Sequence, residues 1–109
     1  MKKYNLKDMV RGWFVGDFEP TVYKTKECEV GYRYYKAGDQ EQPHIHKVAI
    51  ELTLVTSGIV NFNGVDYHEG DIVMIEPGEI SDFKAITDAT NIIVKIPSVK
   101  GDKYLVEEK

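Results

Sequence analysis

Two histidines and a glutamate lie close together near the middle of the sequence. His44 and His46 are separated by one residue, and Glu51 follows five residues after His46. Because residues i and i+2 of an extended strand point to the same face, we expect the two imidazoles to converge on one side. An unbroken strand would place Glu51 on the opposite face, so its carboxylate joins the imidazoles only if a bulge or bend intervenes.

Two imidazoles and one carboxylate form a ligand set for a divalent metal ion. Non-haem iron uses this set, and so does zinc in hydrolytic sites that keep an open position for water or substrate. The alternative is that His44 and His46 are surface residues near a loop and that Glu51 is a solvated carboxylate on a strand. Cys28 is the only cysteine, which excludes an intrachain disulfide and a multi-thiolate metal site within one chain.

A cation and three tyrosines follow one another a few residues earlier. Arg33 and Tyr35 share one face of an expected strand, and Tyr32 and Tyr34 share the other. One of these pairs should face the interior. If it is Arg33 and Tyr35, the interior contains a guanidinium that can form two parallel hydrogen bonds with a carboxylate or phosphate. The alternative is an arginine on the sheet surface beside a tyrosine.

The elements that must position these residues are strands. Apolar runs are short, rich in Val, Ile, Tyr and Phe, and bounded by Gly, Asp, Asn or Pro, and helical spacing is nearly absent. Asn63 and Gly64 separate two such runs and tolerate the positive φ angles of a type I′ turn, which predicts a tight hairpin. We therefore expect an all-β sandwich or small barrel. Its strands should span residues 21–23, 29–36, 45–55, 58–62, 65–67, 71–75, 82–86 and 91–96.

The length and composition limit the class of protein. The 109 residues are enough for one domain, so we expect residues 1–109 to form a single domain with segment 1–20 packing on the barrel. The aromatic segment 12–18 could cover a pocket, pack across the barrel or contribute to a dimer interface. The formal charge of -4, without a Lys/Arg cluster, argues against a nucleic-acid partner. No apolar stretch could span a bilayer, and polar residues interrupt the N-terminus where a signal peptide needs an apolar core, so we expect a cytoplasmic protein.

The sequence resembles the cupin superfamily in two motifs. Gly38, His44, His46, Glu51 and Gly58 match the order and spacing of the first cupin motif. Residues 70–83 are similar to the second motif, with Gly-Asp, an apolar strand, a Pro-Gly turn and an aromatic residue. The resemblance covers residues 38–83, and it implies a double-stranded β-helix, the cupin jelly-roll barrel, with His44, His46 and Glu51 as metal ligands.

The sequence departs from the cupin pattern at Ser81. The second motif usually supplies a third histidine at this position, and serine is a poor ligand for a divalent cation at neutral pH. The resemblance therefore implies a site without its fourth ligand, in which the side of Ser81 is open to substrate or holds a water molecule.

The resemblance implies two classes of function, because the cupin barrel carries many activities. The first is a metal-dependent enzyme, such as an isomerase, epimerase or dioxygenase, that acts on a sugar derivative or an organic acid. It would use Fe, Mn, Ni or Zn, with Arg33, Tyr35 and Ser81 contacting the substrate. The second is a non-catalytic module that binds or senses a small ligand. No nucleophile is paired with a base, and no phosphate-binding glycine loop is present. We expect a homodimer, formed through edge strands or the aromatic N-terminal segment.

Overall fold

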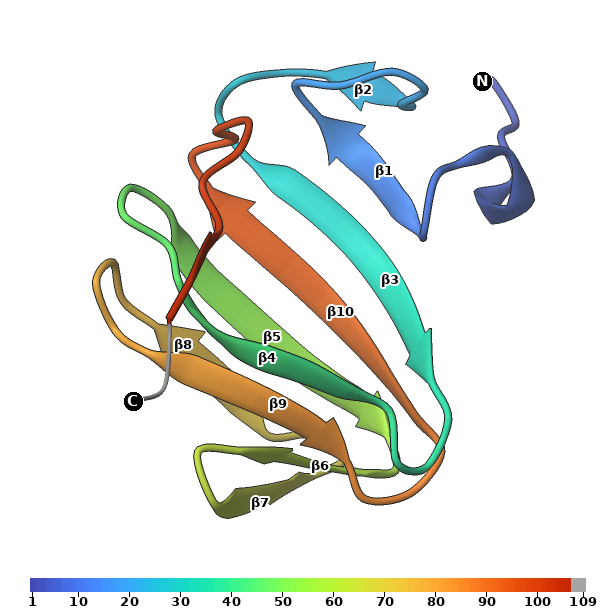
Figure 1. Cartoon of the computed structure of the whole chain (residues 1–109). Coiled ribbons are helices and arrows are strands. Elements are labelled where there is room, and N and C mark those ends of the chain that lie inside the picture. The colour runs from blue at the N-terminus through green and yellow to red at the C-terminus, as the bar shows by residue number, and fades with distance from the viewer. Residues whose placement is uncertain (107–109) are drawn as a thin grey trace.

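The computed structural model describes residues 1–106, and its strands form two sheets that face each other (Figure 1). All strand pairs are antiparallel except β1 with β2, so the expected all-β architecture is confirmed. The six-stranded sheet has the order β2 (Tyr23–Lys24), β1 (Trp13–Gly16), β3 (Glu29–Tyr35), β10 (Ala89–Ile96), β5 (Ile50–Ser57) and β8 (Ile72–Ile75). The five-stranded sheet has the order β11 (Tyr104–Leu105), β4 (Gln40–Ile45), β9 (Ser81–Ala85), β6 (Ile59–Phe62) and β7 (Val65–His68).

The hairpin between β6 and β7 is the one that the sequence predicts. Asn63 and Gly64 have φ angles of 52° and 85°, as a type I′ turn requires, and Phe62 pairs with Val65 directly across the turn. Because this turn fixes the register of both strands, it also fixes which residues of β6 face the other sheet. Val60 and Phe62 face inward and are buried.

The hydrophobic core lies between the sheets, and aromatic rings form its centre. The ring of Phe83 lies 4.5 Å from that of Tyr35 and 5.2 Å from that of Phe62, measured between centroids. Val55 and Val60 are completely buried beside them. This packing fills one part of the interior with apolar side chains, and the inward-facing positions beyond it carry polar groups.

The expected strand at residues 45–55 is wrong as a single element. β4 ends at Ile45, the chain bends at Lys47 and Val48, and β5 begins at Ile50 in the opposite sheet. The expected strands also omit residues 40–44 of β4, because Pro43 argued against a strand there. Proline is tolerated here because the register of β4 against β9 shifts between Glu41 and His44.

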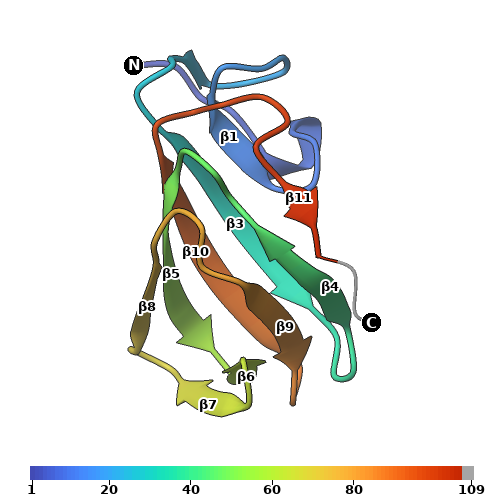
Figure 2. The same ribbon diagram turned by 60° about the vertical axis from the view of Figure 1, so that its left-hand side comes forward.

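Both ends of the described chain pack against the barrel. β1 pairs with β3, so part of the aromatic N-terminal segment forms a strand of the six-stranded sheet. β11 pairs with β4, as Figure 2 shows, and extends the other sheet near the C-terminus. Among residues 1–106 the single helical element is η1 (Leu6–Asp8), and no helix is long and apolar enough to cross a membrane.

Candidate functional site

The inner face of the six-stranded sheet supplies one wall of a cavity. Residues that are directly paired in an antiparallel sheet project to the same face. Lys95 of β10 pairs with Glu51 of β5, and Asn91 of β10 pairs with Arg33 of β3. All four side chains line a cavity of about 160 Å³, together with Thr53 of β5.

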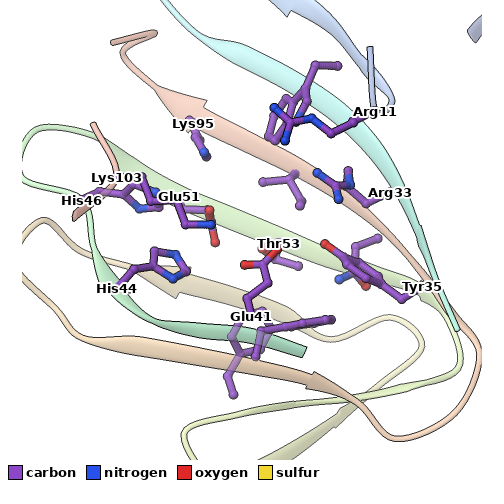
Figure 3. A pocket seen from close by; sticks show the side chains of 15 residues that line it. Arg11, Arg33, Tyr35, Glu41, His44, His46, Glu51, Thr53, Lys95 and Lys103 are labelled. Carbon is purple, nitrogen blue, oxygen red and sulfur yellow. The ribbon is translucent and has the colours of Figure 1, made fainter. Parts of the chain in front are cut away.

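The opposite wall and the rim come from β4 and from the two ends of the chain. Glu41 and His44 lie on β4, and His46 follows its last residue. Arg11 and Lys103 complete the rim, and Figure 3 shows the labelled side chains projecting into the space between the sheets. The aromatic core residues close the cavity on one side, because Tyr35, Phe62 and Phe83 line it as well.

A buried carboxylate explains how His46 and Glu51 come to line the same cavity. Asp102 accepts hydrogen bonds from the backbone N–H groups of Lys47 at 2.9 Å, Val48 at 3.2 Å and Ala49 at 2.9 Å. These bonds hold the bend that carries the chain from one sheet to the other, so Glu51 faces the histidines across the barrel. Strand periodicity could not have indicated this geometry, because Asp102, which holds the bend, follows it by more than 50 residues in the sequence.

A hydrogen bond and burial influence the protonation of the two imidazoles. His44 Nδ1 lies 2.9 Å from the carbonyl oxygen of Gln42. Because a carbonyl only accepts, Nδ1 carries a proton, and in the neutral ring the lone pair is therefore on Nε2. Burial, assisted by the positive charge of Lys95 and by His44, lowers the pKa of His46 to about 4. Both rings are buried, with centroids 5.2 Å apart, and His46 is neutral at physiological pH.

Two further ionisable groups of the cavity have perturbed pKa values. Burial raises the pKa of Glu51, and the ammonium of Lys95 offsets part of this rise. Burial, together with the negative charge of Glu41, raises the pKa of Tyr35 above its ordinary value. The Tyr35 hydroxyl therefore stays protonated and can donate a hydrogen bond to a bound molecule.

The buried polar atoms without a hydrogen-bond partner are concentrated in this cavity. Among residues 1–106 these side-chain atoms are His46 Nε2, Thr53 Oγ1 and both amide atoms of Asn91. All three residues line the cavity. Buried polar groups in folded proteins are nearly always satisfied, so such a set in one place suits a polar molecule that bonds to them.

The residues fit a metal ion in part. Nε2 of His44 and the unpartnered Nε2 of His46 are suitable metal ligands when both rings are neutral. As the side chains lie, however, no three His, Cys, Asp or Glu groups within residues 1–106 are close enough together to hold an ion. Lys95 and Lys103 line the same cavity as Glu51, and their positive charges repel a metal ion there.

The other residues expected at the site have different positions. Arg33 and Tyr35 face the cavity, whereas Tyr32 and Tyr34 point away and are exposed. Ser81 is buried and pairs with His44 across β4 and β9, but it does not line the cavity.

Sequence reasoning missed several residues of the cavity. Asn91 and Lys95 lie an even number of residues apart on β10, so they share one face of the strand. Nothing in the sequence shows whether that face is the inner or the outer one. Arg11, Glu41 and Lys103 lie outside the expected strands and gave no signal at all.

Comparison with solved structures identifies the architecture. No protein-family model and no curated protein sequence matches the chain. An uncharacterized conserved protein with a double-stranded β-helix domain from Klebsiella pneumoniae is similar, with a TM-score of 0.67 and 22% identity over 77% of this chain and 78% of that chain. An RmlC-like cupin from Shewanella frigidimarina has a TM-score of 0.62 and 20% identity, over 70% and 71% of the two chains. The chain has the cupin fold.

A third similar structure is a sugar phosphate isomerase of the cupin superfamily from Silicibacter pomeroyi. The TM-score is 0.61 and the identity 21%, over 66% of this chain and 52% of that chain. At such identities the likeness establishes the cupin barrel, and the activity must be argued from the cavity.

Proposed function

We propose that this cupin binds a small polar molecule in the cavity between its sheets and acts on it with the help of a divalent metal. The observation that carries the proposal is the set of buried polar atoms without partners, which belong to His46, Thr53 and Asn91 and all line one cavity. Leaving such atoms unsatisfied costs about 1–3 kcal/mol each, and a polar ligand offsets this cost. The expected substrates are sugar derivatives and organic acids.

His44 and His46 would hold the metal through their Nε2 atoms, and Glu51 would join them after a change of its side-chain conformation. A bound Fe, Mn, Ni or Zn ion supplies Lewis-acid polarisation of a carbonyl or hydroxyl oxygen, and iron also supports oxygen chemistry. Tyr35 would donate its hydroxyl proton in a hydrogen bond, and the Asn91 amide can donate and accept. Isomerisation or epimerisation fits these roles, and a similar structure is that of a sugar phosphate isomerase.

A second candidate is a binding module without catalytic turnover. Two observations favour it: Lys95 and Lys103 bring positive charge beside Glu51, and the serine at position 81 cannot replace a histidine ligand. In this case the same cavity binds the small molecule, and the ammonium groups of Lys95 and Lys103 supply the positive charge that a metal ion would otherwise supply.

Elemental analysis distinguishes the two candidates. The protein is purified without chelator or affinity metal, beside the double variant H44A/H46A and the control H68A, which removes an exposed histidine of β7. The metal proposal predicts near-stoichiometric metal in the parent and in H68A, and loss of that metal in the double variant, with an unchanged circular dichroism spectrum. Absence of metal from the parent, even after incubation with Fe, Mn, Ni and Zn salts, would contradict it.

A further inference from the structure

Positive charge accumulates in the cavity although the whole chain is negatively charged. Arg33 and Lys95 project from the six-stranded sheet, and Arg11 and Lys103 reach the rim from the two ends of the chain (Figure 3). Glu41 and Glu51 are the carboxylates that line the same space. Four cations therefore face two carboxylates, in a protein with a formal net charge of -4.

These cations are not neutralised by ion pairs. Within residues 1–106 the only ion pair joins Lys24 to Glu19, and it lies on the surface. Two of the cavity cations instead form cation–π contacts with aromatic rings. The ammonium of Lys95 lies 5.0 Å from the centroid of the Trp13 ring, and the guanidinium of Arg33 lies 5.6 Å from that of Tyr35. The hydrogen-bond donors of both cations remain available to a ligand.

A tight turn at residues 10–13 places the side chain of Arg11 at the rim of the cavity. Arg11 has a φ of 51° and Gly12 a φ of 84°, and Trp13 N–H donates to the Val10 carbonyl at 3.1 Å, which makes a type I′ turn. A Cβ atom on Gly12 would overlap the carbonyl oxygen of Tyr32. Arginine rarely adopts a left-handed conformation, and residues held in such conformations cluster at binding sites.

We propose that the cavity selects a small anion, a molecule whose carboxylate or phosphate group is bound by Arg33 and Arg11 while Lys95 and Lys103 add positive charge around it. Arginine matches both groups with two parallel hydrogen bonds. The volume of about 160 Å³ corresponds to roughly five water-sized groups, which fits a small organic acid or triose phosphate. The inference rests on the proposed use of this cavity and does not require the metal.

Trp13 provides the assay, because it is the only tryptophan and its ring lies beneath Lys95 in the cavity. Metal-free protein is titrated at constant ionic strength with glycerol, glycerate and glycerol 3-phosphate while tryptophan fluorescence is recorded. These three molecules share a skeleton and differ in the anionic group. We expect saturable changes with one or both anions and none with glycerol, and the stronger anion identifies carboxylate or phosphate as the preferred group.

Arg33→Gln should weaken binding of the preferred anion about 10-fold or more, because a charge-assisted pair of hydrogen bonds is lost. Lys84→Gln makes the same charge change on an exposed residue of β9 and should leave the affinity unchanged. Binding of glycerol as tight as that of the preferred anion, an equal loss in both variants, or no binding of any of the three would overturn the inference. Repeating the titrations after incubation with metal salts separates the two proposals. A protein that takes up no metal but binds the anion would overturn only the metal proposal, and a protein that binds metal but no anion would overturn only the anion proposal.

A different observation concerns the outer face of the six-stranded sheet. Solvated faces of antiparallel sheets are usually polar, but the outward positions of β3, β10, β5 and β8 contain no charged side chain. One row of directly paired residues joins Tyr32, Ile92, Leu54 and Ile72, and the next row ends at Met74. Ile72 and Met74 are 67% and 57% exposed.

We also propose that this face binds a second copy of the chain, with sheet packed against sheet. A face without charge does not repel its own copy, and two apolar sheets pack about 10 Å apart. The four strands cover roughly 450 Å² when spaced at about 4.8 Å with a rise of about 3.4 Å per residue. Two copies then bury about 900 Å² when the sheets are treated as flat, which is more than most crystal contacts bury and just below the area of about 1,000 Å² expected of a specific interface. The expected homodimer would use a sheet face rather than an edge.

Sedimentation velocity over a concentration series tests the dimer. The double variant I72K/M74K introduces charges at exposed positions, so it should fold normally and sediment as a monomer. The control V65K/I80K changes two exposed apolar residues outside this face and should remain dimeric. A monomeric parent at all concentrations, or a dimer that survives I72K/M74K, would overturn this proposal.

Discussion

Replacing Asp102 by alanine tests the bend that brings His46 and Glu51 together. The variant removes the acceptor of three backbone N–H groups. Lys47 and Val48 are exposed, so their amides can bond to water, whereas Ala49 is 2% exposed and its amide would be left without a partner. That unpartnered donor costs about 1–3 kcal/mol, and the two other bonds, which water can replace at exposed amides, contribute about 0.5–1 kcal/mol each. The expected loss is about 3 kcal/mol.

Urea unfolding followed by circular dichroism measures this loss, and thermal unfolding should show a Tm about 12 °C lower or more. Asp66→Ala is the matched control, because the Asp66 carboxylate accepts one hydrogen bond from Asn61 at an exposed site. The control should cost less than about 0.5 kcal/mol. A loss below about 1 kcal/mol for D102A, or an equal loss in both variants, would refute the role of Asp102 as a clamp.

The same clamp predicts a dependence on pH. Burial alone would raise the pKa of Asp102, but the hydrogen bonds from Ala49, Lys47 and Val48 outweigh it and lower the pKa below its ordinary value. A carboxyl group with a lowered pKa in the folded state stabilises the fold above its unfolded pKa of about 3.9, and this stabilisation disappears as the pH falls through the folded pKa. The difference in unfolding free energy between the parent and D102A should therefore be constant above about pH 5 and shrink below about pH 4. A difference that grows on acidification would contradict the argument.

Three further changes test the core and the cavity. Phe83→Ala removes a ring that packs against Tyr35 and Phe62, and it should cost about 3–5 kcal/mol by urea unfolding; a cost below about 1 kcal/mol would show that this ring is not central to the packing. In a spectrophotometric titration of the folded protein, Tyr35 should ionise only above the ordinary pH range of a tyrosine, and Tyr35→Phe should remove this late phase; an unchanged late phase would contradict the burial of this hydroxyl. Ser81→His places an imidazole directly across from His44, and it should raise the affinity for Zn²⁺ at least about 10-fold by calorimetry; an unchanged affinity in a folded variant would contradict the assignment of the metal position.

The sequence was sufficient for those parts of the fold that depend on local chemistry. The turn at Asn63 and Gly64 follows from the φ angles that these residues accept, and β3 and β8 follow from apolar runs that end at charged or turn residues. The motif spacing placed His44, His46 and Glu51 in one region of the fold, and all three line one cavity. Whether these three hold a metal stays a prediction.

Other features depend on contacts that local sequence does not encode. The bend between β4 and β5 is held by Asp102, far along the chain, so periodicity extended one strand through it. The alternation along β3 showed that Arg33 and Tyr35 share a face, but only the pairing with β10 shows that this face is the inner one. Arg11 and Lys103 reach the cavity because both ends of the chain pack beside the barrel, and no pattern around either residue indicated this.

A crystal structure of the protein as purified, without chelator, would test most directly the claim that this cavity binds a polar ligand. We predict non-protein density within hydrogen-bond distance of the Asn91 amide and of His46 Nε2, with the guanidinium of Arg33 turned toward it. If instead the side chains of Arg33 or Lys95 bond to Asn91 and Glu51 and leave no space for a ligand, the polar atoms are satisfied within the chain and the central claim is wrong.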